Sequence, residues 1–401
     1  MLKVAIPVVA YTLINACGAG EQTVWRALTG DASGLRPNDF APAEALDTWI
    51  GRVADLEQYA LPPSLAQFDC RNHRLAFACL EQDGFAAAVH AASARHGKDR
   101  IGVFVGTSTS GIFATELVYR DLHGASGASG AAMQLSPDFY RYRHCMYAVS
   151  EFVRASLDLK GPAMTVSTAC SSSAKVFAQA ARAIAAGICD AAVVGGVDSL
   201  ALSTLYGFHA LGLLSRRPCA PFDADRDGIS IGEAAGFALL EPGADGAVAL
   251  VGYGESCDGH HMSSPHPQGA GAVKAMRDAL ASASLRPGDI DYVNLHGTGS
   301  QANDVAEDLA MVTVFGTGTP AGSTKGWTGH TLGAAGITEA LITIMAIRGG
   351  WLPGTLHCRT PDSTLQTRIA TTSRPAVIRH AMSNSFGFGG NNCSLVFGAL
   401  A

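Results

Sequence analysis

A strand–helix–strand segment in the middle of the chain constrains the fold more than any other feature. Residues 164–168 are mostly β-branched or apolar, which predicts a strand, and residues 174–186 are rich in alanine, which predicts a helix. A second apolar stretch, residues 190–195, predicts another strand. A strand–helix–strand unit of this length is a right-handed parallel crossover. The predicted fold class is therefore α/β.

The same alternation of elements continues along the rest of the chain. Residues 191–194 are continuously apolar, which indicates a sheet covered on both faces. The 401 residues, 48% of them hydrophobic, are enough for one large domain or two fused halves, with a soft boundary near residues 241–246. A helix is expected at 333–348, and further strands are expected at 4–13, 100–105, 291–295, 376–382 and 393–397.

Cys170 lies on the turn between the first predicted strand and its helix. Such a turn points the side chain out at a helix N-terminus, where unpaired N–H groups and the helix dipole favour a thiolate. A cysteine in this setting is a candidate nucleophile for acyl transfer. The ten cysteines include no CxxC pair and no zinc-like spacing, which predicts reduced thiols packed mostly as small hydrophobic side chains.

Three other segments have an unusual composition. Residues 294–300 (NLHGTGS) end a predicted strand at His296, residues 323–336 (STKGWTGHTLGAAG) place His330 five residues after Lys325, and residues 384–392 (NSFGFGGNN) form a glycine-rich turn. Taken singly, each is more often structural than catalytic, and the glycine-rich turn lacks both phosphate-loop patterns. No metal site is predicted, because no cysteine or carboxylate pattern accompanies the loop histidines His260, His261 and His266.

Charge and hydropathy exclude several classes of protein. The net charge of -6 argues against general nucleic-acid binding. Polar residues and Pro7 interrupt the apolar run of the first 17 residues, which favours an opening strand over a signal peptide. No later stretch approaches the roughly 20 apolar residues that a membrane span needs. A cytoplasmic protein without a membrane span is therefore expected.

Taken together, the Cys170 turn and the three other segments resemble the condensing enzymes of the thiolase superfamily. The resemblance is specifically to the β-ketoacyl-acyl-carrier-protein synthases that elongate fatty acids and polyketides. It covers essentially the whole chain, and residues 190–198 and 221–228 (PFDADRDG) add to it. It implies a five-layered α-β-α-β-α fold made of two similar halves, with the nucleophilic cysteine in residues 1–245 and both histidines in residues 246–401. The family is usually dimeric.

The resemblance also implies a Cys-His-His active site. Cys170 matches the acyl-accepting nucleophile, and His296 and His330 match the two histidines. Lys325 matches the active-site lysine of the family. Phe388 matches the residue whose backbone N–H completes an oxyanion hole and whose ring gates the pocket. Three acidic residues match supporting positions: Glu339, Asp304 and Glu307.

The implied reaction is a decarboxylative Claisen condensation of an enzyme-bound acyl chain with malonyl-acyl-carrier protein. An acyl group is first transferred to Cys170, and the carbanion formed when the malonyl thioester loses CO2 then attacks it. No metal or redox cofactor is expected, because the substrates are carried on the phosphopantetheine of the carrier protein. The expected substrate-binding residues are Thr298, Ser300, Thr115, Met262, Ser263 and Phe386.

The residues around Thr115 suggest a subfamily. Relatives that make ordinary fatty acids tend to have a bulky aliphatic residue near this position, and threonine is smaller and more polar. With residues 107–110 and 256–267, Thr115 is similar to the ketosynthases of aryl-polyene-type pigment clusters. That similarity implies stiff polyene acyl chains and a chain-length-factor partner that lacks the cysteine.

The resemblance implies an acidic acyl carrier protein as partner. Since the chain itself is net negative, docking needs a local basic patch. Arg71 and Arg74 resemble the docking region of the family, although ordinary solvated arginines fit equally well. The implied assembly is a homodimer, or a heterodimer with a chain-length-factor-like chain.

Two other functions fit parts of the sequence. A biosynthetic thiolase would use a second cysteine near the C-terminus, and Cys393 lies in that neighbourhood. That scheme gives His330 no role. A catalytically silent, chain-length-factor-like partner would typically replace the nucleophile, whereas Cys170 and both histidines are intact here.

Overall fold

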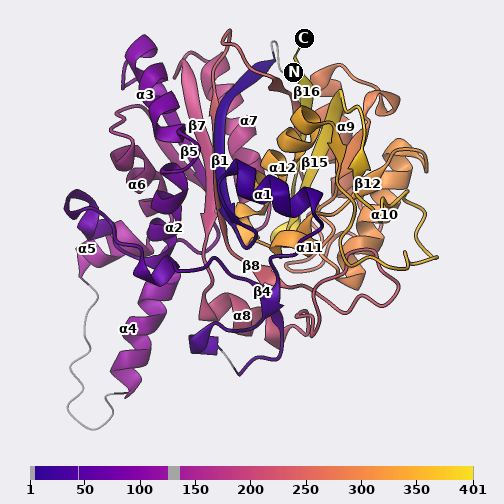
Figure 1. Ribbon diagram of the computed structural model, residues 1–401, viewed down its shortest axis with the longest axis horizontal. Helices are drawn as coiled ribbons and strands as arrows, with labels where there is room; N and C mark the ends of the chain where they lie inside the picture. Colours follow the sequence, from indigo (N-terminus) through magenta and orange to yellow (C-terminus); the bar gives the residue numbers. More distant parts are fainter. Residues whose placement is uncertain (1–4, 44, 125–135, 401) are drawn as a thin grey trace.

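A computed structural model describes residues 5–43, 45–124 and 136–400. Its centre is an eleven-stranded sheet with the order β12-β11-β15-β16-β10-β1-β9-β7-β5-β6, and β2 (Gly18–Ala19) pairs with β1 (Figure 1). The N-terminal half contributes β1 (Ile6–Asn15), β5 (Ile101–Gly106), β6 (Ala163–Val166), β7 (Ala191–Asp198) and β9 (Ala234–Leu240). The C-terminal half contributes β10 (Val248–Cys257), β11 (Tyr292–Asn294), β12 (Ala321–Gly322), β15 (His380–Gly387) and β16 (Asn391–Ala399).

The two halves of the sheet repeat one topology. In the N-terminal half, β5 is parallel to β6 and β7, and β9 is antiparallel to β7 and β1. In the C-terminal half, β11 is parallel to β12 and β15, and β16 is antiparallel to β15 and β10. A short antiparallel pairing of β1 with β10 joins the halves. The predicted pair of similar halves is thereby confirmed.

Five layers stack across the molecule (Figure 1). Between the two halves of the sheet lie two helices that share one hydrophobic core with strands of both halves, α7 (Ser172–Ala185) and α12 (Ala335–Gly349). The outer face of the N-terminal half is covered by α2 (Arg71–Leu80), α3 (Phe85–His96) and α6 (Ala148–Ser156). The outer face of the C-terminal half is covered by α9 (Ala270–Ala283) and α10 (Gln301–Phe315). The predicted α-β-α-β-α fold is confirmed.

Shorter elements surround these layers. The remaining helices are α1 (Glu21–Thr29), α4 (Ile112–Gly124), α5 (Pro137–Phe139), α8 (Leu202–Ala210) and α11 (Lys325–Thr328). A small three-stranded sheet contains β3 (Arg36–Pro37), β4 (Trp49–Gly51) and β8 (Ile231–Gly232), and a two-stranded one contains β13 (Trp351–Leu352) and β14 (Arg374–Pro375). In Figure 1, β8 and α8 lie at the same end of the molecule, below the large sheet.

One helical stretch among the described residues has the length and composition of a membrane span. It is Leu332–Gly349, which has 18 residues and a mean hydropathy of 1.3, and 89% of it is buried inside the structure. Its place between the two halves of the sheet accounts for its apolar sides, because both sides pack in the core. The expectation that no stretch approaches a span overlooked this core helix.

The predicted strand boundaries hold only in part. The first strand was expected over 4–13; β1 spans Ile6–Asn15, and Val4 lies outside the described residues. The strand expected over 164–168 ends earlier, at Val166. The strand expected over 376–382 begins only at His380, and the backbone just before it, at 374–375, pairs in the separate two-stranded sheet as β14. The helix expected over 333–348 begins with a 3-10 turn and becomes α-helical at Ala335.

Candidate active site

Cys170 lies between the end of β6 and the start of α7. Ala169 has a left-handed φ of 53°, and α7 begins at Ser172. The Ser172 hydroxyl accepts a hydrogen bond from the Thr168 N–H and donates one to the Ala169 carbonyl, which closes the turn. Cys170 is only 5% exposed. The strand-to-helix turn is as predicted, but the thiol is enclosed instead of pointing out from the helix end.

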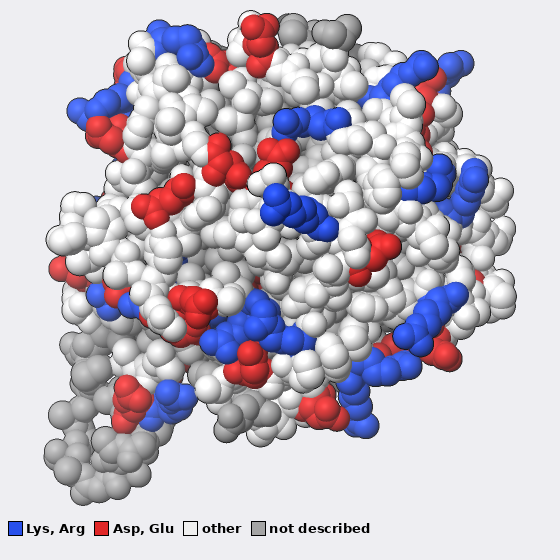
Figure 2. Space-filling model, viewed as in Figure 1, with Lys and Arg blue, Asp and Glu red and all other residues white. Residues whose placement is uncertain are grey.

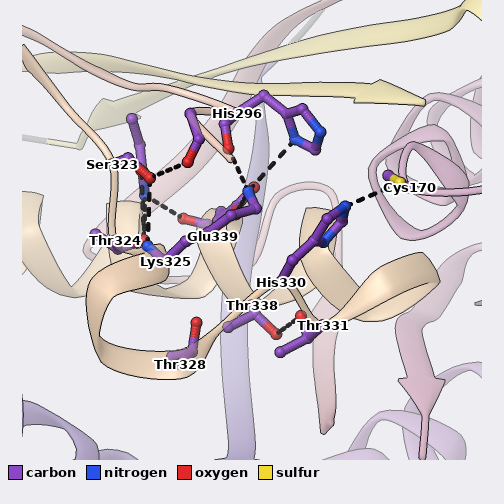
Figure 3. Close-up of polar contacts among 12 residues, drawn as sticks. Cys170, His296, Ser323, Thr324, Lys325, Thr328, His330, Thr331, Thr338 and Glu339 are labelled. Carbon is purple, nitrogen blue, oxygen red and sulfur yellow. Dashed lines mark hydrogen bonds and ion pairs between the residues drawn. The ribbon is translucent and has the colours of Figure 1, made fainter. Parts of the chain in front are cut away.

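The position of His330 is fixed by backbone contacts on both sides. Its N–H donates to the Ser230 carbonyl at 2.7 Å, and its carbonyl accepts from the Gly232 N–H at 2.9 Å. The Leu332 N–H donates to Nδ1 of the His330 ring at 3.2 Å. A neutral imidazole whose Nδ1 accepts carries its proton on Nε2. This Nε2 lies 3.0 Å from Cys170 Sγ (Figure 3).

His296 follows β11 and faces His330. The two ring centroids are 5.2 Å apart, with the ring planes at 86°. A carboxylate of α10, Glu307, accepts from the backbone N–H groups of His296 at 2.8 Å and Gly297 at 2.7 Å. Lys325 Nζ lies 3.4 Å from His296 Nδ1 (Figure 3). An ammonium group can only donate, so the His296 proton is also on Nε2.

A buried ion pair supports the two imidazoles from behind. Lys325 and Glu339 of α12 form a direct ion pair, with side chains 0% and 3% exposed (Figure 3). Lys325 Nζ also donates to the His296 carbonyl. Burial raises the pKa of Glu339 to about 7, and the neighbouring Lys325 opposes that rise. The pair therefore places one positive centre directly beside the histidines.

The other two predicted acidic residues accept hydrogen bonds from backbone N–H groups and do not face the reacting side chains. Asp304 accepts from the Phe222 N–H at 2.9 Å and pairs with the buried Arg226 at 3.4 Å. Burial raises the pKa of Asp304 above its ordinary value, and it raises the pKa of Glu307 to about 7. Glu307 thus holds the loop that carries His296 through the His296 and Gly297 N–H groups, and Asp304 holds it through the Gly299 N–H at 3.3 Å.

The protonation states of the three central side chains follow from their burial. Burial raises the pKa of the Cys170 thiol to about 11, although the charge of Lys325 and the Phe388 backbone N–H directed at the thiol oppose that rise. Burial and the Lys325 charge lower the pKa of both histidines well below 6.5. The resting site is therefore a thiol beside two neutral imidazoles. This differs from the thiolate that the helix terminus alone predicts.

The same three side chains are the one group among the described residues whose ligand atoms could surround a metal ion, all within 4.8 Å of one another. Metal-binding histidines usually donate the N–H of their outer nitrogen to a carboxylate or carbonyl. Here both outer nitrogens face donors, the Leu332 N–H and Lys325 Nζ. Each inner nitrogen then carries a proton and offers no lone pair. The residues present do not fit a metal ion.

A cavity of about 180 Å³ opens onto the three side chains. Phe388 and Phe208 both line it, and their rings stack with centroids 5.4 Å apart. Gly387 packs so tightly that a Cβ there would come within 3.2 Å of the Cys170 nitrogen. The predicted pocket residues that line this cavity are Thr298, Ser300, Ser263, Phe386 and Phe388.

Two predicted substrate-binding residues lie outside this lining. Met262 is 79% exposed, and it contributes only its carbonyl, which accepts from the Gly389 N–H at 2.8 Å. Thr115 is buried in α4, where its hydroxyl lies 2.8 Å from His144 Nδ1. The loop turns the Met262 side chain to solvent, so its role in substrate binding stays a prediction. For Thr115 the structure places the side chain against His144 and not against this cavity.

The predicted docking residue Arg71 lies in a buried ion pair. Arg71 is 8% exposed and pairs with Glu57 and the fully buried Glu233, so it presents no free charge. Arg74 is partly exposed, but both oxygens of Asp69 accept from its guanidinium. On the face shown in Figure 2, positive and negative side chains are interspersed.

Sequence reasoning missed two residues that shape the site. Phe208 of α8 lines the cavity and stacks on Phe388, but an aromatic residue in a helix gives no signal of its own. Asp198 ends β7 and accepts hydrogen bonds from the loop after β5 and from the turn after His330. Its signal in the sequence was a carboxylate at the end of a continuously apolar strand.

Comparison with known sequences gives one consistent family. Residues 4–246 match the family model described as beta-ketoacyl synthase, N-terminal domain, and residues 247–359 match that of the C-terminal domain. The 3-oxoacyl-[acyl-carrier-protein] synthase 2 of Vibrio cholerae is 32% identical over 99% of both chains. The mitochondrial 3-oxoacyl-[acyl-carrier-protein] synthase of Arabidopsis thaliana is 32% identical over 97% of this chain and 92% of its own.

Solved structures give the same result. A ketosynthase (ApeO) in complex with its chain length factor (ApeC) from Xenorhabdus doucetiae has a TM-score of 0.89 and 38% identity, covering 99% of this chain and 98% of its own. The ishigamide ketosynthase/chain length factor has a TM-score of 0.88 and 26% identity over 99% of each chain. The fold and the buried Cys-His-His arrangement define a thiolase-like condensing enzyme. The chain belongs to the beta-ketoacyl synthase family.

Proposed function

We propose that this protein catalyses the decarboxylative Claisen condensation of a Cys170-bound acyl chain with a malonyl thioester. The observation that carries the proposal is the pair of neutral imidazoles, both with Nε2–H groups facing the Cys170 side, one of them 3.0 Å from the sulfur. Two hydrogen-bond donors beside one nucleophile suit a reaction in which negative charge develops on a thioester oxygen.

The first step is transfer of the acyl group to the sulfur. The Cys170 thiol attacks the acyl thioester of the carrier, the new S–C bond forms, and the thiol proton leaves with the departing carrier thiol. The backbone N–H groups of Cys170 and Phe388 hold the oxyanion of the tetrahedral intermediate. A donor of this kind contributes about 3–4 kcal/mol.

The second step uses both histidines as donors. A malonyl thioester enters the vacated site, and its thioester oxygen accepts from Nε2–H of His296 and His330. The C–CO2 bond breaks, CO2 leaves, and the electron pair becomes an enolate that the two donors stabilise. The enolate carbon attacks the acyl-Cys170 carbonyl, and the thiolate that is released takes up a proton. The hydroxyls of Thr298 and Ser300, 2.9 Å apart on the cavity wall, suit the amides of a pantetheine arm.

This scheme needs no metal or redox cofactor, and the substrates arrive on the phosphopantetheine of an acyl carrier protein. The support for a carrier protein comes from the relatives, which are 3-oxoacyl-[acyl-carrier-protein] synthases. We place the reaction in the cytoplasm, as the sequence predicts.

We also propose a chain-length-factor-like partner and, with it, elongation of polyketide or aryl polyene chains. The support is the 38% identity to a ketosynthase that was solved with its chain length factor. A homodimer engaged in fatty acid elongation is the second candidate. In either assembly the edge strand β6, which pairs only with β5 among the described residues and where Met164 is 41% exposed, offers backbone groups to a partner.

Intact-mass measurement tests the proposed reaction. The protein is incubated with acyl-carrier proteins of different chain types, and we expect one acyl adduct that is absent from Cys170→Ala. The preferred chain type separates fatty acid from polyketide or aryl polyene substrates. If wild type forms no adduct and Cys170→Ala leaves malonyl decarboxylation unchanged, the protein is a silent partner.

The thiolase alternative loses support from the position of Cys393. This residue is 0% exposed in the interior of β16, and it is not among the residues that line the cavity. Burial raises the pKa of its thiol far above the ordinary value. A base for thiolase chemistry must reach the substrate, and this thiol does not.

A further inference from the structure

Asp198 has an unusual set of partners for a fully buried carboxylate. It is 0% exposed at the end of β7, and no ion pair joins it to a cation within the described part of the chain. Three hydroxyls donate to its oxygens, those of Thr107 at 2.6 Å, Ser108 at 2.6 Å and Thr109 at 2.7 Å. Backbone N–H groups donate as well, those of Ser108, Thr109 and Gly333, the last at 2.6 Å. Such charge-assisted bonds are short and strong, so this carboxylate ties the end of β7 to two segments, the loop of residues 107–109 and the turn at Gly333.

One of these segments is the turn that follows His330. Gly333, which donates to Asp198, is the neighbour of Leu332, whose N–H holds the His330 Nδ1. Leu332 has a left-handed φ of 54°, a conformation that a residue with a branched side chain keeps only when its surroundings enforce it. A Cβ on Gly333 would lie 2.6 Å from both Asp198 Oδ2 and the Ser108 nitrogen. The turn is therefore pressed against the loop that Asp198 organises.

We propose that Asp198 is a positioning residue for His330. Its carboxylate holds the Gly333 N–H, which keeps the Leu332 turn in its strained form and the Leu332 N–H on the His330 ring. The proton of the neutral imidazole then stays on Nε2, where it can be donated to the thioester oxygen. If the turn relaxed, the proton could move to Nδ1, and the Nε2 lone pair would repel the developing oxyanion. The inference rests on the proposed function, because only that reaction needs the donor.

A second effect of Asp198 must be separated from this one. The negative charge of Asp198 raises the pKa of the Cys170 thiol. Removing the charge alone would therefore make Cys170 more reactive toward an alkylating reagent. A purely electrostatic role predicts faster alkylation without loss of decarboxylation, whereas a positioning role predicts loss of decarboxylation.

The test is Asp198→Asn, which keeps the size of the side chain but turns one acceptor oxygen into a donor. We expect kcat for malonyl decarboxylation to fall roughly 10-fold or more, part of what a positioned proton donor contributes, with KM unchanged. Nitrogen NMR of ¹⁵N-histidine-labelled protein, assigned with a His330→Asn sample, reports the tautomer directly. We expect the His330 Nε2–H signal pattern in wild type and a mixed pattern in Asp198→Asn.

Thr109→Val is the matched control. It removes one hydroxyl donor to Asp198 and leaves the Gly333 bond in place, so its kcat should stay within about twofold of wild type. If Asp198→Asn does not fold, Gly333→Ala replaces it, since that change keeps the carboxylate and displaces the turn. It should produce the same mixed tautomer and the same fall in kcat.

Two results would overturn the proposal: an unchanged Nε2–H tautomer, or a wild-type kcat, in a folded Asp198→Asn protein. The two readouts also separate this inference from the proposed function. A wild-type protein without decarboxylase activity whose tautomer still changes in Asp198→Asn would refute the function and keep the role of Asp198. An active wild type with an unchanged tautomer in the variant would keep the proposed function and refute the role of Asp198.

Discussion

Two effects compete at the sulfur atom of Cys170. The N-terminus of α7 favours a thiolate through its dipole and free N–H groups. Burial opposes the charge and raises the pKa of the thiol to about 11. Because the enclosure leaves Cys170 only 5% exposed, desolvation wins in the free protein. The resting nucleophile is thus a thiol that becomes charged only as the acyl thioester arrives.

This balance gives a pH prediction. Since only the thiolate reacts with iodoacetamide, the alkylation rate of Cys170 should rise roughly tenfold per pH unit between about pH 7 and 10. Mass spectrometry of the Cys170 peptide after timed quenching measures this rate, with the exposed Cys257 as an internal reference. A plateau below about pH 8 would mean that the helix terminus outweighs burial.

Lys325 also acts at the scale of single residues. Lys325→Met keeps the length of the side chain but removes the donor to His296 Nδ1 and the cation beside Glu339. We expect malonyl decarboxylation to fall by on the order of 100-fold, the size of one proton-donor contribution. The pKa of Glu339 should rise above about 7, since Lys325 holds it down.

Lys175→Met on α7 provides the control for this experiment, because that lysine pairs with Glu255 and lies outside the site. Its decarboxylation rate should equal that of wild type. Equal losses in the two variants would show that the effect of Lys325 is not local to the histidines.

Between elements, buried charge pairs tie α2 to the region around β8. Glu233, which follows β8, accepts from Arg71 of α2 and from the N–H groups of Val53 and Leu200. Arg71→Ala leaves this carboxylate buried without its cation, and we expect a loss of about 3–5 kcal/mol in the free energy of unfolding. Arg74→Ala breaks a more exposed pair and should cost at most about 1 kcal/mol. Urea denaturation compares the two. If Arg71→Ala were fully stable yet bound acyl carrier protein poorly, the predicted docking role of Arg71 would be confirmed.

The same pair of arginines shows what sequence could and could not predict. The nucleophile turn, both histidine segments and the glycine-rich turn are local patterns, and their joint resemblance to a known family predicted the five-layered fold and the site residues. The burial of Arg71 depends on Glu233, 162 positions away in the chain. The partners of Asp198 likewise lie 89 to 135 positions away. Contacts of that separation are decided by the packing of the layers, which no local pattern encodes.

At the scale of the whole molecule, β6 is an edge strand of the large sheet, and within the described part of the chain it pairs only with β5. The Val103 and Thr107 N–H groups of the β5 region donate to the carbonyls of Pro162 and Val166. Because backbone groups alternate along a strand, the N–H and carbonyl of Thr165 point away from β5. An edge with such free groups is a template for pairing with another chain.

Thr165→Pro tests whether the proposed partner uses this edge. Proline removes the free N–H and leaves the pairing with β5 intact, so we expect the assembly to weaken at least roughly tenfold. The measurement is light scattering after size-exclusion chromatography, on the chain alone and co-expressed with a chain-length-factor-like chain. Thr165→Val is the matched control, since both variants lose the hydroxyl contact with Ser150 and only proline loses the N–H. Dimers that survive in Thr165→Pro would place the interface on another surface, and dimers that vanish in both variants would point to the hydroxyl instead of the strand edge.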